Sequence, residues 1–261
     1  MTLAAIKVLL TRPAGQSDGL ARAIASEGGH SVSYPVMRIE GLDEQADAVV
    51  CQRTKQLLMN LDHYQQVIFI STNAVHYGMA WIEQYWPQLP TGIEWHAIGT
   101  ATGQALTAAG VSTAGAAQST GMNSEALLQH ASLQVLDNTR ILIVRGVGGR
   151  EYLGEQLRQR GARVDYAECY QRSKVERPAG ELAQLLQRER VNCLLVNSGE
   201  TLDYTCQLPD AGQLKGLPTI VPGERVAGMA RERGFSNIVV ASNASTDAIM
   251  VALAKVAEHQ K

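Results

Sequence analysis

Residues 141–161 read ILIVRGVGGREYLGEQLRQRG, and this stretch decides the predicted fold. Its first four residues form an apolar run of the kind found in strands of parallel sheets. A glycine-rich turn follows, and Leu153 and Leu157 then recur at helical spacing before Gly161 ends the pattern. The stretch therefore predicts a strand, a tight turn and a helix.

A second copy of this pattern lies near the N-terminus, where residues 8–29 read VLLTRPAGQSDGLARAIASEGG. In the alignment Arg12 matches Arg145, and Gly15 matches Gly148. Three further pairs follow in the same order: 67–74 with 193–200, 97–110 with 221–234, and 123–128 with 245–250. One strand–turn–helix unit resembles any other, but four matches in order indicate an internal duplication.

Strand-like runs alternate with helical patterns along the whole chain, which predicts an α/β fold with parallel sheets covered by helices. The predicted strands are IKVLLT, HSVSYPV, QQVIFI, EWHAIG, TRILIVR, ARVDYAE, NCLLV, PTIV and NIVVA. A duplicated chain of this kind predicts two similar lobes, most simply 1–135 and 136–261. Ligands of such sheets bind beyond the carboxyl ends of the strands, so we expect a cleft between the lobes.

Composition and charge argue against several classes of function. The chain has 261 residues, 45% of them hydrophobic and 18% charged, as in ordinary globular proteins. A net charge of −2 without a basic run argues against nucleic-acid binding. No stretch reaches the ~18 apolar residues that cross a bilayer, and Arg12-Pro13 interrupts the N-terminal segment before a signal-peptide core. We expect a cytoplasmic monomer with a small-molecule partner and no membrane contact.

The common catalytic and cofactor motifs do not match. Glu151 stands where a dinucleotide-binding GxGxxG motif needs a small residue, and the Lys-Ser/Thr of a P-loop is missing after Gly149. The four cysteines form no CxxC and no group with the six histidines, so no metal site or disulfide is predicted. The histidines stand apart in sequence, and only His96, at a strand end, has a position of functional interest. No cofactor is expected.

Anion binding remains the chemistry that the sequence favours. Arg12 and Arg145 each follow a predicted strand, where they either meet a carboxylate or phosphate or pair with an acid of the protein. The junctions between strands and helices are rich in small and hydroxyl residues, whose free amides can bind anions or simply cap helices. The candidates at these junctions are Ser71, Thr72, Asn73, Gly99, Thr100, Gly146, Gly199 and Gly223.

Several motifs together resemble the uroporphyrinogen-III synthase family, from Val8 to Leu253. They are LLTRPAGQ (9–16), PVMRI (35–39), FISTNAV (69–75), AIGTATGQAL (97–106), LIVRGVGGRE (142–151), YQR (170–172), NSGE (197–200) and ASTDAIMVAL (244–253). The resemblance implies intertwined lobes in place of tandem ones. One lobe would hold 1–38 and 173–261, the other 39–172, with extended connectors near 38–42 and 168–173 that act as hinges.

The resemblance also implies an activity. Family members convert hydroxymethylbilane, a linear tetrapyrrole with acetate and propionate groups, into cyclic uroporphyrinogen III for heme and siroheme synthesis. Water is lost, ring D is inverted through a spiro intermediate, and no metal or organic cofactor takes part. A transient contact with the deaminase that produces the bilane is expected. The competing interpretation is a non-catalytic two-lobed protein that binds or senses small anions.

Individual residues follow from the matching motifs. Tyr170 matches the family's tyrosine proposed to assist loss of the hydroxyl group, although a tyrosine in a connector can also serve packing alone. Thr102 and Ser198 match hydroxyl residues that line the cleft. The second copy has Val226 where the first has Thr102, so the two lobes are not expected to bind substrate in the same way.

Overall fold

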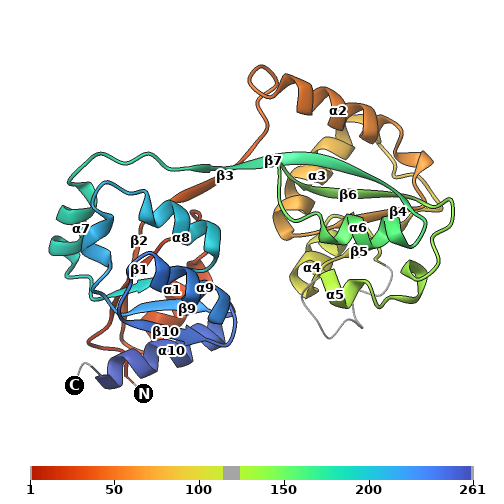
Figure 1. Cartoon of the computed structure of the whole chain (residues 1–261). Coiled ribbons are helices and arrows are strands. Elements are labelled where there is room, and N and C mark those ends of the chain that lie inside the picture. Colours follow the sequence, from red (N-terminus) through yellow and green to blue (C-terminus); the bar gives the residue numbers. More distant parts are fainter. Residues whose placement is uncertain (1, 114–123, 260–261) are drawn as a thin grey trace. The chain divides into compact units, whose positions relative to one another are not determined.

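The chain passes twice between two compact units, between residues 38 and 39 and again between 172 and 173. This computed structural model describes residues 2–113 and 124–259 (Figure 1). Unit 1 comprises Met1–Arg38 and Ser173–Lys261, and unit 2 comprises Ile39–Arg172. Each unit contains one five-stranded sheet with helices on both faces. The α/β class with two helix-covered sheets dominated by parallel strands is thereby confirmed.

The sheet of unit 1 has the strand order β2-β1-β8-β9-β10, and every neighbouring pair is parallel. Its strands are β1 Lys7–Leu10, β2 His30–Ser33, β8 Cys193–Leu195, β9 Thr219–Pro222 and β10 Ile238–Ala241. Its helices are α1 Asp18–Ser26, α7 Glu181–Glu189, α8 Gly199–Cys206, α9 Glu224–Glu232 and α10 Thr246–His259, with the short turn η3 Ala211–Leu214. Strand β1 is central and buried on both faces: Val8 and Leu10 pack with α1 and α10, and Leu9 packs with α7, α8 and α9.

The sheet of unit 2 has the order β3-β7-β6-β4-β5. Its strands are β3 Met37–Gly41, β4 Gln66–Phe69, β5 Glu94–Ala97, β6 Arg140–Gly146 and β7 Arg163–Lys174, of which β3 begins and β7 ends two residues inside unit 1. Its helices are α2 Ala48–Met59, α3 Thr72–Tyr85, α4 Thr100–Ala108, α5 Ser124–Leu127 and α6 Tyr152–Gln159, with the short turns η1 Leu61–His63 and η2 Ala131–Leu133. In β6, Leu142 and Val144 pack on the side of α2, α3 and α4, whereas Ile141 and Ile143 face α5 and α6.

The two sheets repeat one another. Strands β1, β8 and β9 of unit 1 stand in the same order as β6, β4 and β5 of unit 2. The paired glycines also share a left-handed conformation that other residues rarely adopt: φ is 78° at Gly15 and 71° at Gly148, and 81° at Gly28 and 96° at Gly161. The backbone therefore repeats where the sequence does.

One of the sequence pairings is off by one residue. The alignment of 67–74 with 193–200 sets Ser71 against Asn197, but the structure matches Ser71 with Ser198. Each of these serines is the N-cap of its helix and accepts a backbone hydrogen bond from the residue three positions later. The strand register gives the same pairing. Ile141 and Val8 are matched residues, and their partners on the neighbouring strands are Gln66 and Cys193, which lie five residues before Ser71 and Ser198. The fourth matched segment begins at Asn123, which lies outside the described residues.

The segments that the sequence treats as connectors belong to strands. Residues 37–41 form β3, which the apolar pattern does not predict, and β7 continues without interruption to Lys174. Strand β3 is an edge strand in which Met37 alone is buried, so it lacks the apolar run that marks a central strand. Among the described residues, no helix is long and apolar enough to cross a membrane.

Candidate active site

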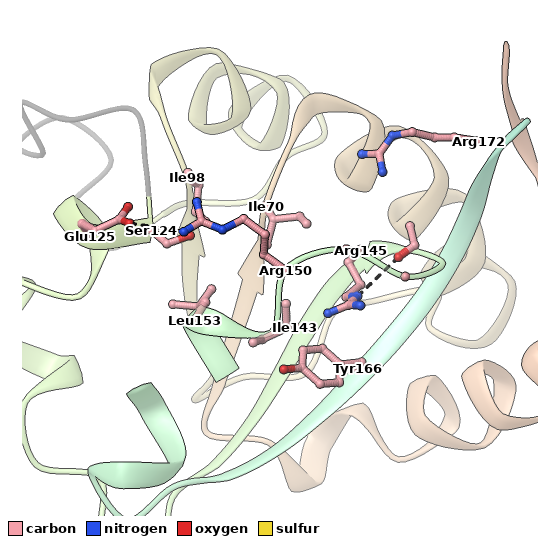
Figure 2. A pocket seen from close by; sticks show the side chains of 13 residues that line it. Ile70, Ile98, Ser124, Glu125, Ile143, Arg145, Arg150, Leu153, Tyr166 and Arg172 are labelled. Carbon is pink, nitrogen blue, oxygen red and sulfur yellow. Dashed lines mark hydrogen bonds and ion pairs between the residues drawn. The ribbon is translucent and has the colours of Figure 1, made fainter. Parts of the chain in front are cut away.

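A cavity of about 400 Å³ lies at the carboxyl end of the sheet of unit 2 (Figure 2). Ile70 and Ile98 come directly after β4 and β5, and Arg145 and Gly146 end β6. The full lining is Ile70, Ile98, Ser124, Glu125, Ile143, Arg145, Gly146, Gly148, Gly149, Arg150, Leu153, Tyr166 and Arg172. This is the edge where parallel sheets bind ligands.

The charged lining is mostly cationic. Arg145, Arg150 and Arg172 line the cavity together with a single carboxylate, that of Glu125. Arg150 is 80% exposed and lies 3.9 Å from Glu125, so this ion pair is weak and can open to a ligand. Three guanidinium groups around one cavity favour a small molecule that carries carboxylates.

Arg145 pairs with acids of the protein, which is one of the two roles that the sequence left open, and it also lines the cavity. Its side chain is buried, with Nη1 3.0 Å from Oε1 of Glu151 and Nε 3.7 Å from Oε1 of Glu168. The guanidinium also stacks 4.4 Å above the ring of Tyr166. Acids of the protein thus hold Arg145 in place while it lines the cavity.

The glycine-rich turn binds a carboxylate of the protein itself. The backbone N–H of Gly148 donates to Oε1 of Glu168 at 3.1 Å, the same oxygen that Arg145 approaches. Gly148 and Gly149 have φ of 71° and 104°, which a glycine adopts without strain. The glycine-rich turn therefore uses this amide to position Glu168.

Tyr170 lies directly behind the cavity wall. A register shift after Arg145 places Tyr170 opposite Gly146, and the tyrosine ring is fully buried. Its hydroxyl lies 3.1 Å from Oγ of Ser71, which also accepts the N–H of Ala74 as the N-cap of α3. The ring stacks on Tyr77 with 5.4 Å between centroids. Two of the predicted site residues, Tyr170 and Ser71, are therefore hydrogen-bonded to each other.

Replacement of Gly146 by alanine tests this contact. The added Cβ would lie 2.6 Å from Cε2 of Tyr170, so the ring must move. We expect Gly146→Ala to lower the free energy of unfolding by ~1–3 kcal/mol, as overpacking of a filled core does. The measurement is urea unfolding followed by tryptophan fluorescence, since Trp81, Trp86 and Trp95 all lie in unit 2.

Gly41→Ala is the matched control. Its added Cβ would meet the ring of Tyr77 at an ordinary 3.6 Å, and its φ is not left-handed. We expect this change to stay within about 0.5 kcal/mol of the parent. Equal unfolding midpoints for the two variants would contradict the close packing of Gly146 on Tyr170.

The remaining predicted residues of unit 2 cluster at two helix N-termini beside the cavity. Thr72 and Asn73 begin α3, Gly99 is the N-cap of α4, and Thr100 opens that helix. Thr102 is buried in the first turn of α4. Of the predicted residues, Arg145 and Gly146 line the cavity directly, and these N-termini start one or two residues beyond Ile70 and Ile98.

Unit 1 carries the other predicted residues at the corresponding edge of its own sheet. Arg12 donates to the carbonyls of Ala244 at 2.9 Å and Gln16 at 3.5 Å, and burial lowers the pKa of its guanidinium. Glu168, which lies opposite Arg145, corresponds to Pro35 in unit 1 when the register of β1 and β2 is extended by two residues. The predicted Ser198, Gly199 and Gly223 lie at the N-termini of α8 and α9, where Ser198 and Gly223 are N-caps.

Sequence reasoning missed several cavity residues. Arg150 lies five positions after Arg145 in the stretch that decided the fold, and Arg172 lies in the YQR motif. The signal that could have identified both is their position: each is a cationic residue in a motif that contains a predicted site residue. Tyr166, Ser124 and Glu125 gave no such signal, because only strand register and helix packing bring them to the cavity.

The fold and this cavity define a two-unit α/β protein with a site suited to an anionic small molecule. A family model described as uroporphyrinogen-III synthase HemD matches residues 18–250. The chain belongs to the uroporphyrinogen-III synthase family. It is 32% identical to the uroporphyrinogen-III synthase of Escherichia coli K12 and 34% identical to that of Salmonella typhimurium LT2, over 95% of this chain and all of each relative.

Solved structures agree on the fold. A mutant uroporphyrinogen III synthase from Thermus thermophilus matches with a TM-score of 0.58 at 16% identity, over 98% of this chain and 100% of that one. The uroporphyrinogen-III synthetase from Helicobacter pylori 26695 matches with a TM-score of 0.58 at 14% identity, over the full length of both chains. At this identity the likeness concerns the fold alone.

Proposed function

We propose that this chain closes hydroxymethylbilane to uroporphyrinogen III, with loss of water and inversion of ring D. Family membership supports the reaction, and the cation-lined cavity of unit 2 supports the substrate class. The bilane carries many carboxylates, and the guanidinium groups of Arg145, Arg150 and Arg172 are opposite to them in charge. The N-termini of α3 and α4 add partial positive charge, each worth about 0.3–1 kcal/mol to an anion.

The observation that carries the mechanism is the hydrogen bond between Tyr170 and Ser71. Breaking the C–O bond of the hydroxymethyl group produces an azafulvene, and the leaving oxygen must take up a proton to depart as water. A tyrosine hydroxyl keeps its proton at neutral pH and is therefore a general acid. Because the Tyr170 ring is fully buried and Ser71 is only partly buried, we propose that the proton reaches the substrate through the Ser71 hydroxyl.

The later steps need little further chemistry from the protein. The substituted carbon of the last pyrrole attacks the azafulvene, and the resulting spiro intermediate fragments and recloses with ring D inverted. The proton lost as the ring closes replaces the one that left with the water. Hydroxymethylbilane closes unaided to the uninverted isomer, so its reactivity is intrinsic. The protein's main contribution is then to hold one conformation of the bound chain.

The other predicted residues enter the proposal as carboxylate ligands. We propose that Arg12, Ser198, Gly199 and Gly223 bind substrate carboxylates in unit 1, and that Ser71, Thr72, Asn73, Gly99, Thr100, Thr102 and Gly146 contribute in unit 2. Units 1 and 2 correspond to the two lobes of the family, with residues 38–42 and 168–173 as connectors. We also propose a cytoplasmic monomer that receives its unstable substrate through transient contact with the bilane-producing deaminase.

Incubation with freshly generated hydroxymethylbilane tests the proposal. The products are oxidised to uroporphyrins, and the isomers are separated by chromatography. We expect isomer III to dominate, against isomer I in a control without protein. Isomer I alone, together with tight binding of the bilane, would instead favour a non-catalytic binding protein.

A further inference from the structure

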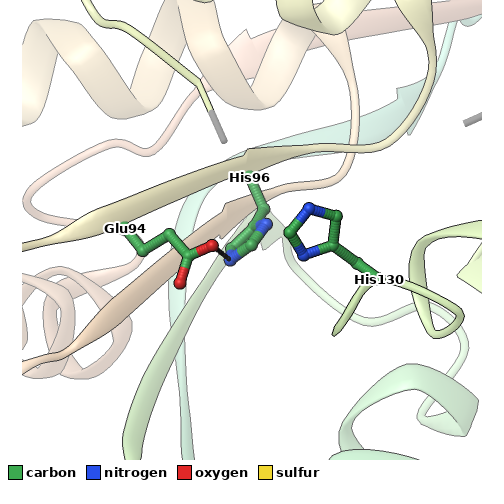
Figure 3. A group of neighbouring side chains, drawn as sticks. All are labelled: Glu94, His96 and His130. Carbon is green, nitrogen blue, oxygen red and sulfur yellow. Dashed lines mark ion pairs between the residues drawn. The ribbon is translucent and has the colours of Figure 1, made fainter. Parts of the chain in front are cut away.

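Two histidines that stand 34 positions apart in sequence meet in unit 2 (Figure 3). His96 lies between Glu94, two positions earlier on β5, and His130, which precedes η2. The rings are 5.3 Å apart between centroids, and Nε2 of His96 is 3.7 Å from Oε1 of Glu94. One ligand atom from each of the three residues can be chosen so that all lie within 4.8 Å of one another.

His96 is the unusual member of this group. Its side chain is completely buried, and both ring nitrogens lack a hydrogen-bond partner among the described residues. Buried polar groups in native proteins nearly always have a partner, so an unpartnered imidazole inside a packed sheet calls for a ligand.

Ser132 holds the ring of His130. The Nδ1 of this ring accepts the backbone N–H of Ser132 at 3.4 Å and lies 2.8 Å from Oγ of the same residue, so a metal on Nε2 requires Nδ1 to carry the proton and donate it to that hydroxyl. Ser132 is anchored in turn, because its carbonyl accepts a hydrogen bond from Nε2 of Gln66 at 3.0 Å. Gln66 lies opposite Glu94 across the β4–β5 pair, which connects both ends of the cluster.

We propose that Glu94, His96 and His130 bind one divalent transition-metal ion, and that Zn²⁺ is the best match. Two imidazoles and one carboxylate form a ligand set that Zn²⁺ accepts with water in the fourth position. Tetrahedral Zn²⁺ ligands at ~2.1 Å from the ion stand roughly 3.4 Å apart, so distances of up to 4.8 Å within the cluster must shorten by as much as about 1.4 Å. Glu94 and His130 are partly exposed, which gives the ion a way in and these side chains room to turn.

The position of the cluster implies a structural role outside the proposed reaction. His130 follows α5, whose residues Ser124 and Glu125 line the active-site cavity. An ion bound by both His130 and β5 would tie this short helix to the sheet. The sequence predicted no metal site because Glu94, His96 and His130 match no spaced ligand motif.

Calorimetric titration of the chelator-treated full chain with Zn²⁺ tests the proposal. We expect one ion per chain and no comparable binding of Mg²⁺ or Ca²⁺, which prefer oxygen ligands. His130→Ala and Glu94→Gln should each weaken binding at least tenfold, and Ser132→Ala should weaken it by roughly tenfold through the orientation of His130. His63→Ala, which removes an exposed histidine of η1, is the matched control and should bind like the parent.

The visible absorption of bound Co²⁺ reports on the metal ligands themselves and not on the stability of the fold. Co²⁺ at this site should give the intense visible absorption of a four-coordinate ion, and His130→Ala should lose it. Zn²⁺ should also raise the thermal midpoint of the parent and of His63→Ala but not that of His130→Ala. Equal Zn²⁺ affinity in His130→Ala and His63→Ala, or no Zn²⁺ binding by the parent, would overturn the proposal. The isomer assay is independent of either result.

Discussion

Replacing Tyr170 with phenylalanine is expected to lower the rate of isomer-III formation by ~10²–10⁴-fold, the usual contribution of a positioned general acid. The change removes one hydroxyl from a fully buried ring and leaves its stacking on Tyr77 intact. Weak synthesis of isomer III should persist, because the substrate is reactive by itself and the binding groups remain. The measurement is the initial rate of isomer III, with the III-to-I ratio as a second readout.

Two further variants separate catalysis from packing. Tyr77→Phe removes the hydroxyl of the stacking partner, which donates to the carbonyl of Ile39, and should leave the rate nearly unchanged. Ser71→Ala should slow isomer-III formation about as much as Tyr170→Phe, because both residues lie on one proton path. The double variant should then be little worse than either single one. An unchanged rate in Tyr170→Phe would remove Tyr170 from the mechanism.

Ser71→Ala also removes a helix cap, so its stability must be measured alongside its rate. Loss of a serine N-cap typically costs ~0.5–2 kcal/mol, which a folded enzyme tolerates. Under conditions where both variants are fully folded, a slow Ser71→Ala supports the relay. A fast Ser71→Ala combined with a slow Tyr170→Phe would show that Tyr170 reaches the substrate directly.

The sequence predicted the fold well because buried parallel strands leave a strong pattern. Each of the nine predicted strand segments overlaps a strand, although β6, β7 and β9 run beyond their segments, and the duplication appears in the order of both sheets. The prediction failed where burial is weak, at the edge strand β3. It also slipped by one residue at Ser71, because apolar strands align almost equally well in neighbouring registers and only the N-cap geometry fixes the pairing.

The candidate site was less accessible from sequence for a different reason. Strand ends and helix N-termini can be read from local patterns, so Arg145 and Ser71 were visible. The contact between Ser71 and Tyr170 spans 99 positions and depends on a register shift between β6 and β7. Whether an arginine at a strand end pairs with an acid also depends on the residue that the neighbouring strand places beside it. Arg145 has Glu168 at that position, whereas the matching Arg12 has Pro35.

Arg145→Met is expected to lower the free energy of unfolding of unit 2 by about 2–4 kcal/mol. Removing one partner of a buried ion pair costs ~3–5 kcal/mol when the other is left buried. The full penalty is not expected, because Glu151 is 47% exposed and Glu168 is 23% exposed. The guanidinium also gives up its stacking on Tyr166, while methionine keeps much of the apolar volume. Urea unfolding followed by tryptophan fluorescence measures the change in unit 2.

Arg140→Met on the same strand is the matched control. Arg140 also pairs with an acid, Asp165 at 3.8 Å, and stacks on Tyr64, but its side chain is 37% exposed. Its loss should therefore cost no more than about 1 kcal/mol. Adding Glu168→Gln to Arg145→Met removes the stranded charge and should restore about 1 kcal/mol, whereas Glu168→Gln alone should destabilise. Equal losses of unfolding free energy in Arg145→Met and Arg140→Met would show that burial does not strengthen the ion pairs of Arg145.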